Sequence, residues 1–310
     1  MKYLIYQLNS KSSSEKLINE TDYHEILISR SCLLEISLFE EKYNFIIENY
    51  IEFEKELLNI STQMMVLQII DPVEMRECKN NLSRRIANLL TTCTMYLDSC
   101  QHHMKTILCN QKEIDEKIDQ LKNTQYDNIL GYRVIEALRN HTQHRGFPIH
   151  NALFSYSLTA DEPHLHRHSV IPVLDLSELE KNKKFKTAIL HELKSLSKKF
   201  IFDMRIFIRD YIEAISNIHK ILREMYEEKF IESENKLKNI VINNVSDSGF
   251  NYYLSGVSLL SIDENGEMIN RQTLYSGFLE NLYNYRKQNT SLINLRKRYS
   301  SNEIQDEDLD

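Results

Sequence analysis

The chain has 310 residues, a formal net charge of −7 at pH 7, and 42% hydrophobic and 27% charged residues. It is long enough to bury a full core in one large domain or two smaller ones, and its charge excludes a globally basic surface. With only 6 glycines and 4 prolines, long helices are favoured over many short strands and turns. We therefore expect a mostly α protein: a bundle of long helices with one or two inserted β-hairpins.

The amino terminus and the cysteines indicate the compartment. The first eight residues contain too short an apolar run for a secretory signal peptide. No segment approaches the roughly 18 uninterrupted apolar residues that a membrane span needs. The five cysteines include no C-x-x-C pair and are expected to be reduced thiols packed in helices. We expect a cytoplasmic protein without a membrane segment, and we expect no cofactor.

The first part of the chain is expected to lead into long helices. Residues 1–30 are predicted to be an amino-terminal segment that starts with a short strand, with the serine-rich residues 10–14 as a loop. From about Ser31, apolar residues recur at intervals of three and four, which predicts a helix. Asp71-Pro72-Val73-Glu74 has the capping residue, first-turn proline and acidic residue that begin another helix, which is expected to reach about Cys109.

The middle of the chain is also predicted to be mainly helical. Residues 111–122 are expected to form a shorter polar helix or a loop. A further helix is predicted from about Asp127 to His144, because Gly146 just past its end and Pro148 two residues later form a conventional stop.

The second half combines hairpins with one very long helix. Residues 151–173 predict a β-hairpin inserted in the helical bundle, which is expected to span residues 31–239. Apolar residues repeat at three and four positions from Ser177 or Phe185 to Met225, which predicts a single long helix. Residues 240–299 are expected to be a mixed extension with a second hairpin, and the acidic residues 300–310 a disordered tail.

The end of the helix predicted over residues 127–144 carries the most informative segment. Asn140 and His144 are four residues apart and therefore share a helix face, and the long side chain of Arg139 can reach the same spot. A titratable imidazole, a planar cation and an amide suit phosphodiester cleavage without a metal. His144 could transfer protons, Arg139 could stabilise charge on the phosphate, and Asn140 could orient either partner.

The pattern Arg139-Asn140-x-x-x-His144 resembles the R-x(4–6)-H signature of the HEPN superfamily, and the flanking residues are similar to bacterial HEPN-like proteins. The resemblance covers the helices from about Asp71 to His144, and it would include the long helix from Phe185. It implies a helical homodimer and a metal-independent ribonuclease of a toxin or anti-phage defence system, with a cognate antitoxin or partner protein. By this resemblance, Arg139, Asn140 and His144 are catalytic and two copies meet across a dimer groove. Gly146 replaces the tyrosine of one toxin subgroup, so modification of that tyrosine is not implied.

Three other sets of residues have competing interpretations. His164, His166 and His168 alternate along a predicted strand and would face one side, so they could bind zinc, contact RNA, or form a solvated edge. Lysines of the predicted long helix, together with Arg145, could follow an RNA backbone or form a plain solvated face. These lysines are Lys194, Lys198 and Lys199. The alternative to a ribonuclease is a non-catalytic helical dimer that binds a partner protein or a nucleotide.

Overall fold

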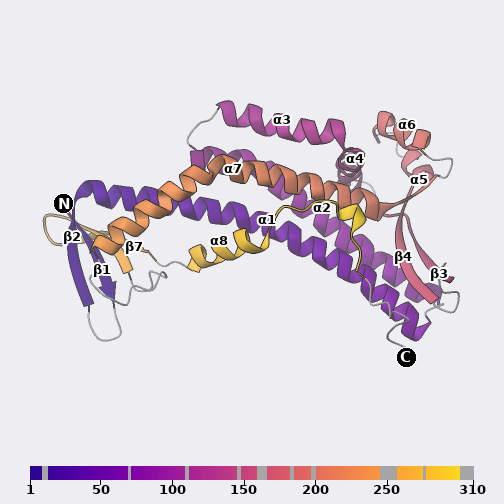
Figure 1. Cartoon of the computed structure of the whole chain (residues 1–310), viewed down its shortest axis with the longest axis horizontal. Coiled ribbons are helices and arrows are strands. Elements are labelled where there is room, and N and C mark those ends of the chain that lie inside the picture. The colour runs from indigo at the N-terminus through magenta and orange to yellow at the C-terminus, as the bar shows by residue number, and fades with distance from the viewer. Residues whose placement is uncertain are drawn as a thin grey trace. The chain divides into compact units, whose positions relative to one another are not determined.

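A computed structural model describes most of the chain and is mostly α-helical with two small antiparallel sheets, which confirms the predicted fold class (Figure 1). The residues that it describes are 1–8, 13–68, 71–108, 112–144, 148–158, 166–181, 185–196, 200–244, 257–274 and 277–300. Within these ranges, no helix is both long and apolar enough to cross a membrane.

The described helices and strands do not alternate regularly along the sequence. The helices are α1 (Glu20–Leu67), α2 (Pro72–Leu108), α3 (Lys112–Asn128), α4 (Leu130–His144), α5 (Leu176–Glu180), α6 (Thr187–Leu196), α7 (Met204–Asn244), α8 (Gly277–Gln288) and a short 3-10 helix (Leu295–Lys297). The strands are β1 (Lys2–Leu8), β2 (Ser13–Ile18), β3 (Asn151–Leu158), β4 (His166–Asp175), β5 (Ile201–Asp203), β6 (Val257–Ile262) and β7 (Met268–Thr273).

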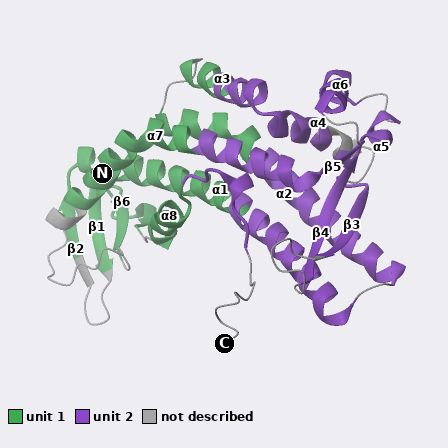
Figure 2. Cartoon of the chain, turned by 45° about the vertical axis from the view of Figure 1, so that its right-hand side comes forward, with its two compact units in different colours: residues 1–45, 95–118, 220–290 green, residues 46–94, 119–219, 291–310 purple. Residues whose placement is uncertain are grey.

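The chain forms two compact units, each assembled from three separate stretches (Figure 2). Unit 1 contains residues 1–45, 95–118 and 220–290, and unit 2 contains residues 46–94, 119–219 and 291–310. Helices α1, α2, α3 and α7 each contribute residues to both units. Neither unit is therefore a continuous piece of sequence.

Unit 1 contains a four-stranded sheet with the strand order β2-β1-β6-β7. The predicted carboxyl-terminal hairpin is confirmed as β6 and β7, whose turn contains Gly266 at a φ of 87°, a value that favours glycine. The carboxylate of Asp263 accepts hydrogen bonds from the backbone amides of Asn265 and Glu267, at 2.9 and 2.7 Å, and so fixes the turn. Strand β1 then pairs with β6, so segments that are far apart in the sequence meet in one sheet.

The helical part of unit 1 packs around aromatic side chains. The ring of Phe39 on α1 is 5.4 Å from that of Tyr96 on α2 and 6.2 Å from that of Tyr226 on α7, measured between centroids. All three side chains are fully buried. These rings occupy the large apolar faces that the spacing of three and four residues predicts for the helices.

A buried ion pair lies beside these rings. The carboxylate of Glu40, which has no exposed surface, accepts two hydrogen bonds from Arg223, from Nε at 2.7 Å and from Nη2 at 2.5 Å. It also accepts one from the hydroxyl of Tyr226, and Nη1 of Arg286 on α8 lies 3.9 Å away. Burial alone would lower the pKa of Arg223, but Glu40 raises it above its ordinary value. The carboxylate therefore joins α1, α7 and α8 of unit 1.

Unit 2 combines helices with a three-stranded sheet of order β3-β4-β5. The predicted hairpin over residues 151–173 is confirmed as β3 and β4, in which Phe154 pairs with Val170. The helical core of this unit is made of side chains that are almost completely excluded from solvent. They include Phe53, Ile60, Ile86, Leu89, Val134, Ile135, Leu138 and Ile215.

The prediction of one long helix from Ser177 or Phe185 to Met225 is wrong. The region contains two shorter helices, α5 and α6, and the strand β5, and a separate helix α7 begins at Met204. Leu196 and Phe200 fit the helical spacing, yet they are 59% and 53% exposed and belong to no buried stripe. The carboxylate of Asp203 accepts a hydrogen bond from the backbone amide of Arg205 at 2.9 Å, which stabilises the start of α7.

The first helix begins earlier than the sequence pattern indicates. Helix α1 starts at Glu20 rather than near Ser31, and the side chain of Asn19 accepts a hydrogen bond from the backbone amide of Asp22 at 2.7 Å. Asparagine is among the best residues for this capping position. Ser13 and Ser14, which were predicted to lie in the serine-rich loop, belong to strand β2, and residues 10–12 lie outside the described residues. The predicted turn at residues 161–163 and nearly all of the predicted acidic tail lie outside the described residues.

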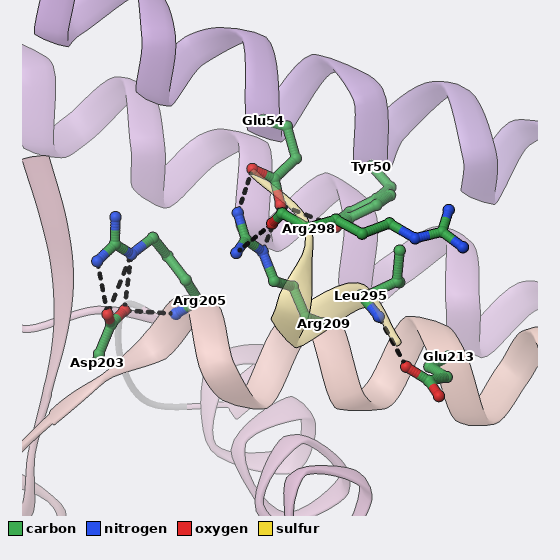
Figure 3. A network of polar contacts seen from close by, with 8 residues as sticks. All are labelled: Tyr50, Glu54, Asp203, Arg205, Arg209, Glu213, Leu295 and Arg298. Atoms are coloured by element: carbon green, nitrogen blue, oxygen red, sulfur yellow. Dashed lines mark hydrogen bonds and ion pairs between the residues drawn. The ribbon is translucent and has the colours of Figure 1, made fainter. Parts of the chain in front are cut away.

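The described end of the chain is held against α7 within unit 2 (Figure 3). The backbone amide of Leu295 donates to Glu213 at 3.0 Å, and the carbonyl of Arg298 accepts from Arg209 at 3.3 Å. Arg209 also makes two hydrogen bonds of 2.9 Å to the carboxylate of Glu54 on α1. The carboxyl-terminal segment is thus attached to the helix bundle through polar contacts.

Gly131 allows a close approach between α4 and α7. A Cβ atom at this position would lie 2.4 Å from Cβ of Asp210, which side-chain rotation cannot relieve. We predict that Gly131→Ala lowers the free energy of unfolding by about 1–3 kcal/mol, as expected for overpacking. At a solvent-exposed helix position, the same change from glycine to alanine would raise the free energy of unfolding by roughly 1 kcal/mol. Urea denaturation distinguishes the two signs, and a stabilised variant would contradict the close approach.

Candidate functional site

Helix α4 carries the predicted site residues near its carboxyl end. It runs from Leu130 to His144, so Arg139, Asn140 and His144 lie on one helix. The side chains of Asn140 and His144, and the whole of Arg145, lie outside the described part of the chain. The described geometry of this set is therefore that of Arg139 and its neighbours.

Two features fix α4 within unit 2. Its apolar face, which includes Val134, Ile135 and Leu138, has no solvent exposure. Arg133, near the start of the helix, donates to the Glu192 carboxylate on α6 at 3.3 and 2.6 Å. The same guanidinium donates to the backbone carbonyls of Tyr126 and Asp127, both at 2.7 Å, where α3 ends. These contacts give the helix that carries Arg139 a defined position in unit 2.

Arg139 is ion-paired and only partly exposed. Its Nη1 lies 3.3 Å from Oε2 of Glu136, one turn earlier on α4, and the two side chains are 22% and 19% exposed. The Nε atom of Arg139 and the hydroxyl of Thr142 are both buried, and no hydrogen-bond partner is found for either among the described residues. Such unpaired buried donors are uncommon, because each of them costs free energy in the folded state. With respect to the described residues, these two donors near the carboxyl end of α4 therefore have unused hydrogen-bonding capacity.

Tyr211 on α7 fixes the other oxygen of the Glu136 carboxylate. The Tyr211 hydroxyl donates to Oε1 of Glu136 at 2.6 Å. Burial, and then the nearby Glu136, raise the pKa of Tyr211 well above its ordinary value, so its hydroxyl stays protonated and available as a donor. The result is a chain of polar contacts from Tyr211 through Glu136 to Arg139.

The buried thiol of Cys93 lies in the same region and is unsuited to nucleophilic chemistry. Burial, followed by the charge of Glu136, raises its pKa well above the ordinary value, so the thiolate is disfavoured. The described cysteines are all buried and none is in a disulfide, in agreement with the expected packed thiols. They are Cys32, Cys78, Cys93 and Cys100.

Glu136 and Tyr211 were not among the site residues predicted from the sequence. A signal for Glu136 existed, because a glutamate three residues before an arginine on a helix lies beside it. Tyr211 had no such signal, since it is 75 residues away from Glu136 in the chain. Only the packing of α7 beside α4 brings it to the carboxylate.

The predicted histidine cluster is only partly described. His166 and His168 lie on β4, and the ring of Tyr156 on β3 is 4.9 Å from the first and 5.2 Å from the second, between centroids. His164 lies outside the described residues. Among the residues that are described, no group of three or more histidine, cysteine, aspartate or glutamate side chains could hold a metal ion. The described part of the cluster is an aromatic contact on the hairpin, with Tyr156 61% exposed.

The lysines predicted to contact RNA are also partly described. Lys194 on α6 forms an ion pair with Glu180, so its charge is already balanced in this structure. Lys198 and Lys199 lie outside the described residues. An RNA contact at Lys194 would have to displace Glu180.

One histidine of unit 1 is buried and paired. Nδ1 of His103 lies 2.7 Å from Oε1 of Glu35, and its Nε2 is buried, with no partner found in the described ranges. Burial, with the charge of Lys42, lowers the pKa of His103, and Glu35 opposes this change. Because a carboxylate only accepts hydrogen bonds, Nδ1 is the donor of the neutral ring. His103 belongs to unit 1, whereas α4 belongs to unit 2.

Comparisons of the chain with protein-family models, with curated proteins and with solved structures found no match.

Proposed function

We propose that the protein is a metal-independent endoribonuclease of the HEPN type, with Arg139, Asn140 and His144 as its catalytic residues. The observation that carries the proposal is the pattern Arg139-Asn140-x-x-x-His144 on the single helix α4. The Nε of Arg139 and the hydroxyl of Thr142, for which no partner is found among the described residues, support it, because a buried polar atom without a partner calls for an explanation such as a catalytic role or a bound ion.

The proposed reaction cleaves the RNA chain without a metal. The imidazole of His144 takes the proton of a ribose 2′-hydroxyl, whose oxygen attacks the adjacent phosphorus, or the acid form gives a proton to the leaving 5′-oxygen. The guanidinium of Arg139 stabilises the charge that grows on the phosphate oxygens, and Asn140 orients the reacting groups. The products are a 2′,3′-cyclic phosphate and a 5′-hydroxyl. DNA lacks the attacking hydroxyl and is not cleaved.

The proposal includes a homodimer and an RNA partner. Two copies of the motif would face one groove, and Arg145, Lys194, Lys198 and Lys199 would contact the RNA backbone, with Lys194 leaving its ion pair with Glu180. A role as a toxin or defence effector, with a cognate partner protein, follows from the same resemblance. Analytical ultracentrifugation measures the oligomeric state, and a monomer at working concentrations would contradict the two-copy site.

The proposed function is tested with purified protein and mixed cellular RNA in EDTA. We expect cleavage with cyclic phosphate ends and no cleavage of DNA of the same sequence. A parallel preparation from cells without the gene controls for contaminating nucleases. Intact RNA across several substrates, or cleavage that stops when EDTA is added, would contradict the proposed reaction.

The second candidate is a non-catalytic dimer that binds a partner protein or a nucleotide. The ion pair between Arg139 and Glu136 favours it, because a pair of this kind also serves simply to stabilise the end of a helix. The two candidates differ in their response to His144→Ala. A partner-binding protein would keep its binding and its biological effect in this variant, whereas a ribonuclease would lose both cleavage and effect.

A further inference from the structure

The contacts around Arg139 begin at a rigid point on α7. The side chain of Tyr211 is only 1% exposed, and its ring packs on that of Tyr132, with 5.1 Å between the centroids. A buried aromatic ring held in this way has little freedom, so the position of its hydroxyl is set by the packing of the core. That hydroxyl donates to Glu136 at 2.6 Å.

The carboxylate of Glu136 is held through both of its oxygens. Oε1 accepts from Tyr211, and Oε2 faces Nη1 of Arg139 at 3.3 Å. A carboxylate with one oxygen fixed by a buried donor cannot rotate freely, so the other oxygen has a defined direction. The neighbouring guanidinium is thereby held by a fixed anion rather than by a mobile surface side chain.

We propose that Glu136, fixed by Tyr211, is a positioning residue that sets the orientation of the Arg139 guanidinium for phosphate binding. The inference rests on the proposed ribonuclease function. A free arginine side chain has many rotamers, and a phosphate must restrict them when it binds. If the guanidinium is already held in its binding orientation, its N–H donors face the phosphate before negative charge develops on the phosphate oxygens. Donors that are fixed in this way stabilise the transition state without having to reorganise.

Three variants separate this role from general stabilisation of α4. In Glu136→Gln the amide oxygen still accepts from Tyr211, but the amide NH2 meets the NH2 of Arg139, so only the contact to Arg139 is lost. Tyr211→Phe removes the hydroxyl and keeps the buried ring. Glu192→Gln is the control, because it breaks the ion pair of Arg133, which lies on the same helix as Arg139 and is 17% exposed, against 22% for Arg139.

Steady-state cleavage of a defined RNA gives the first readout. We expect Glu136→Gln to lower kcat roughly tenfold with KM changed less than about threefold, since a misplaced donor acts mainly on the transition state. Tyr211→Phe should also lower kcat, but by a smaller factor, and Glu192→Gln should have the kcat of the wild type. Unchanged or faster cleavage by Glu136→Gln would overturn the inference, and the faster rate would mean that Glu136 competes with the phosphate.

Nitrogen-15 NMR of the arginine side chains gives a second readout that does not depend on cleavage. The guanidinium signals of Arg139, assigned with Arg139→Lys, should show hindered rotation in the wild type and faster rotation in Glu136→Gln and Tyr211→Phe. Equal rotation in all three proteins would overturn the positioning role even if RNA is cleaved. Hindered rotation in a wild type that cleaves no RNA would instead overturn the ribonuclease and leave the orientation of Arg139 standing.

Discussion

Glu40→Ala is expected to lower the free energy of unfolding by about 3–5 kcal/mol, because it leaves a buried cation without its partner. Arg223 makes two hydrogen bonds to this carboxylate and its side chain is only 18% exposed. The hydroxyl of Tyr226 also loses its acceptor. Removing one member of a buried pair costs far more than the pair contributes when intact, since the remaining charge is still held away from water.

Chemical denaturation followed by circular dichroism measures this loss. The matched control is Glu52→Gln, which breaks an ion pair to Arg85 in which Glu52 is 51% exposed. Exposed pairs contribute about 0–1 kcal/mol, so this variant should stay close to the wild type. Similar stabilities of the Glu40→Ala and Glu52→Gln proteins would show that Glu40 does not hold unit 1 together in solution.

His144→Ala is expected to slow RNA cleavage by about 100-fold or more, the typical range for loss of a general acid or base being roughly 10²–10⁴. In the proposed reaction His144 is the residue that transfers protons, and water replaces it poorly. The measurement is the initial rate of cleavage of a defined RNA at several pH values. Thermal melting should remain close to the wild type, because the loss is chemical.

The control for this variant is His191→Ala. His191 is an exposed histidine on α6, outside the proposed site. We expect the His191→Ala protein to cleave RNA at the wild-type rate. If His144→Ala cleaves as fast as His191→Ala, then His144 is not the acid or base and the catalytic role assigned to the end of α4 is wrong.

Local signals in the sequence predicted much of the fold. The cap, proline and acidic residue at residues 71–74 predicted the start of α2, where the Asp71 carboxylate accepts a hydrogen bond from the amide of Val73 at 2.6 Å. The hairpins β3–β4 and β6–β7 followed from short alternating runs with turn residues between them. Each of these signals acts within a few residues, so a single sequence contains it completely.

Features that depend on distant partners could not be predicted in this way. The pairing of β1 with β6 joins segments that are far apart in the chain, and neither strand alone specifies the other. The division between α6 and α7 was missed because Leu196 and Phe200 continue the apolar spacing although they are exposed. Which apolar residues are buried is decided by tertiary packing.

The candidate site shows the same division between local and distant information. The spacing of Arg139, Asn140 and His144 was readable because all three lie on one helix. Tyr211 reaches Glu136 from another helix, 75 residues later, and its role could not be anticipated. Residues of a motif on one helix can be recognised from the sequence, whereas the residues that surround the motif are brought there by tertiary packing.

The sheet of unit 1 has a consequence for synthesis on the ribosome. Strand β1 (Lys2–Leu8) lies far ahead of its partner β6 (Val257–Ile262) in the sequence, so it leaves the ribosome long before β6 is translated. At a translation rate of ~5–20 residues per second, the edge of β1 that later pairs with β6 stays unpaired for roughly tens of seconds. An unpaired edge attracts other strands, so chaperones that shield nascent chains should raise the folded yield. Expression at a lower temperature with additional chaperone should therefore help this protein more than one whose first strand pairs with its neighbours.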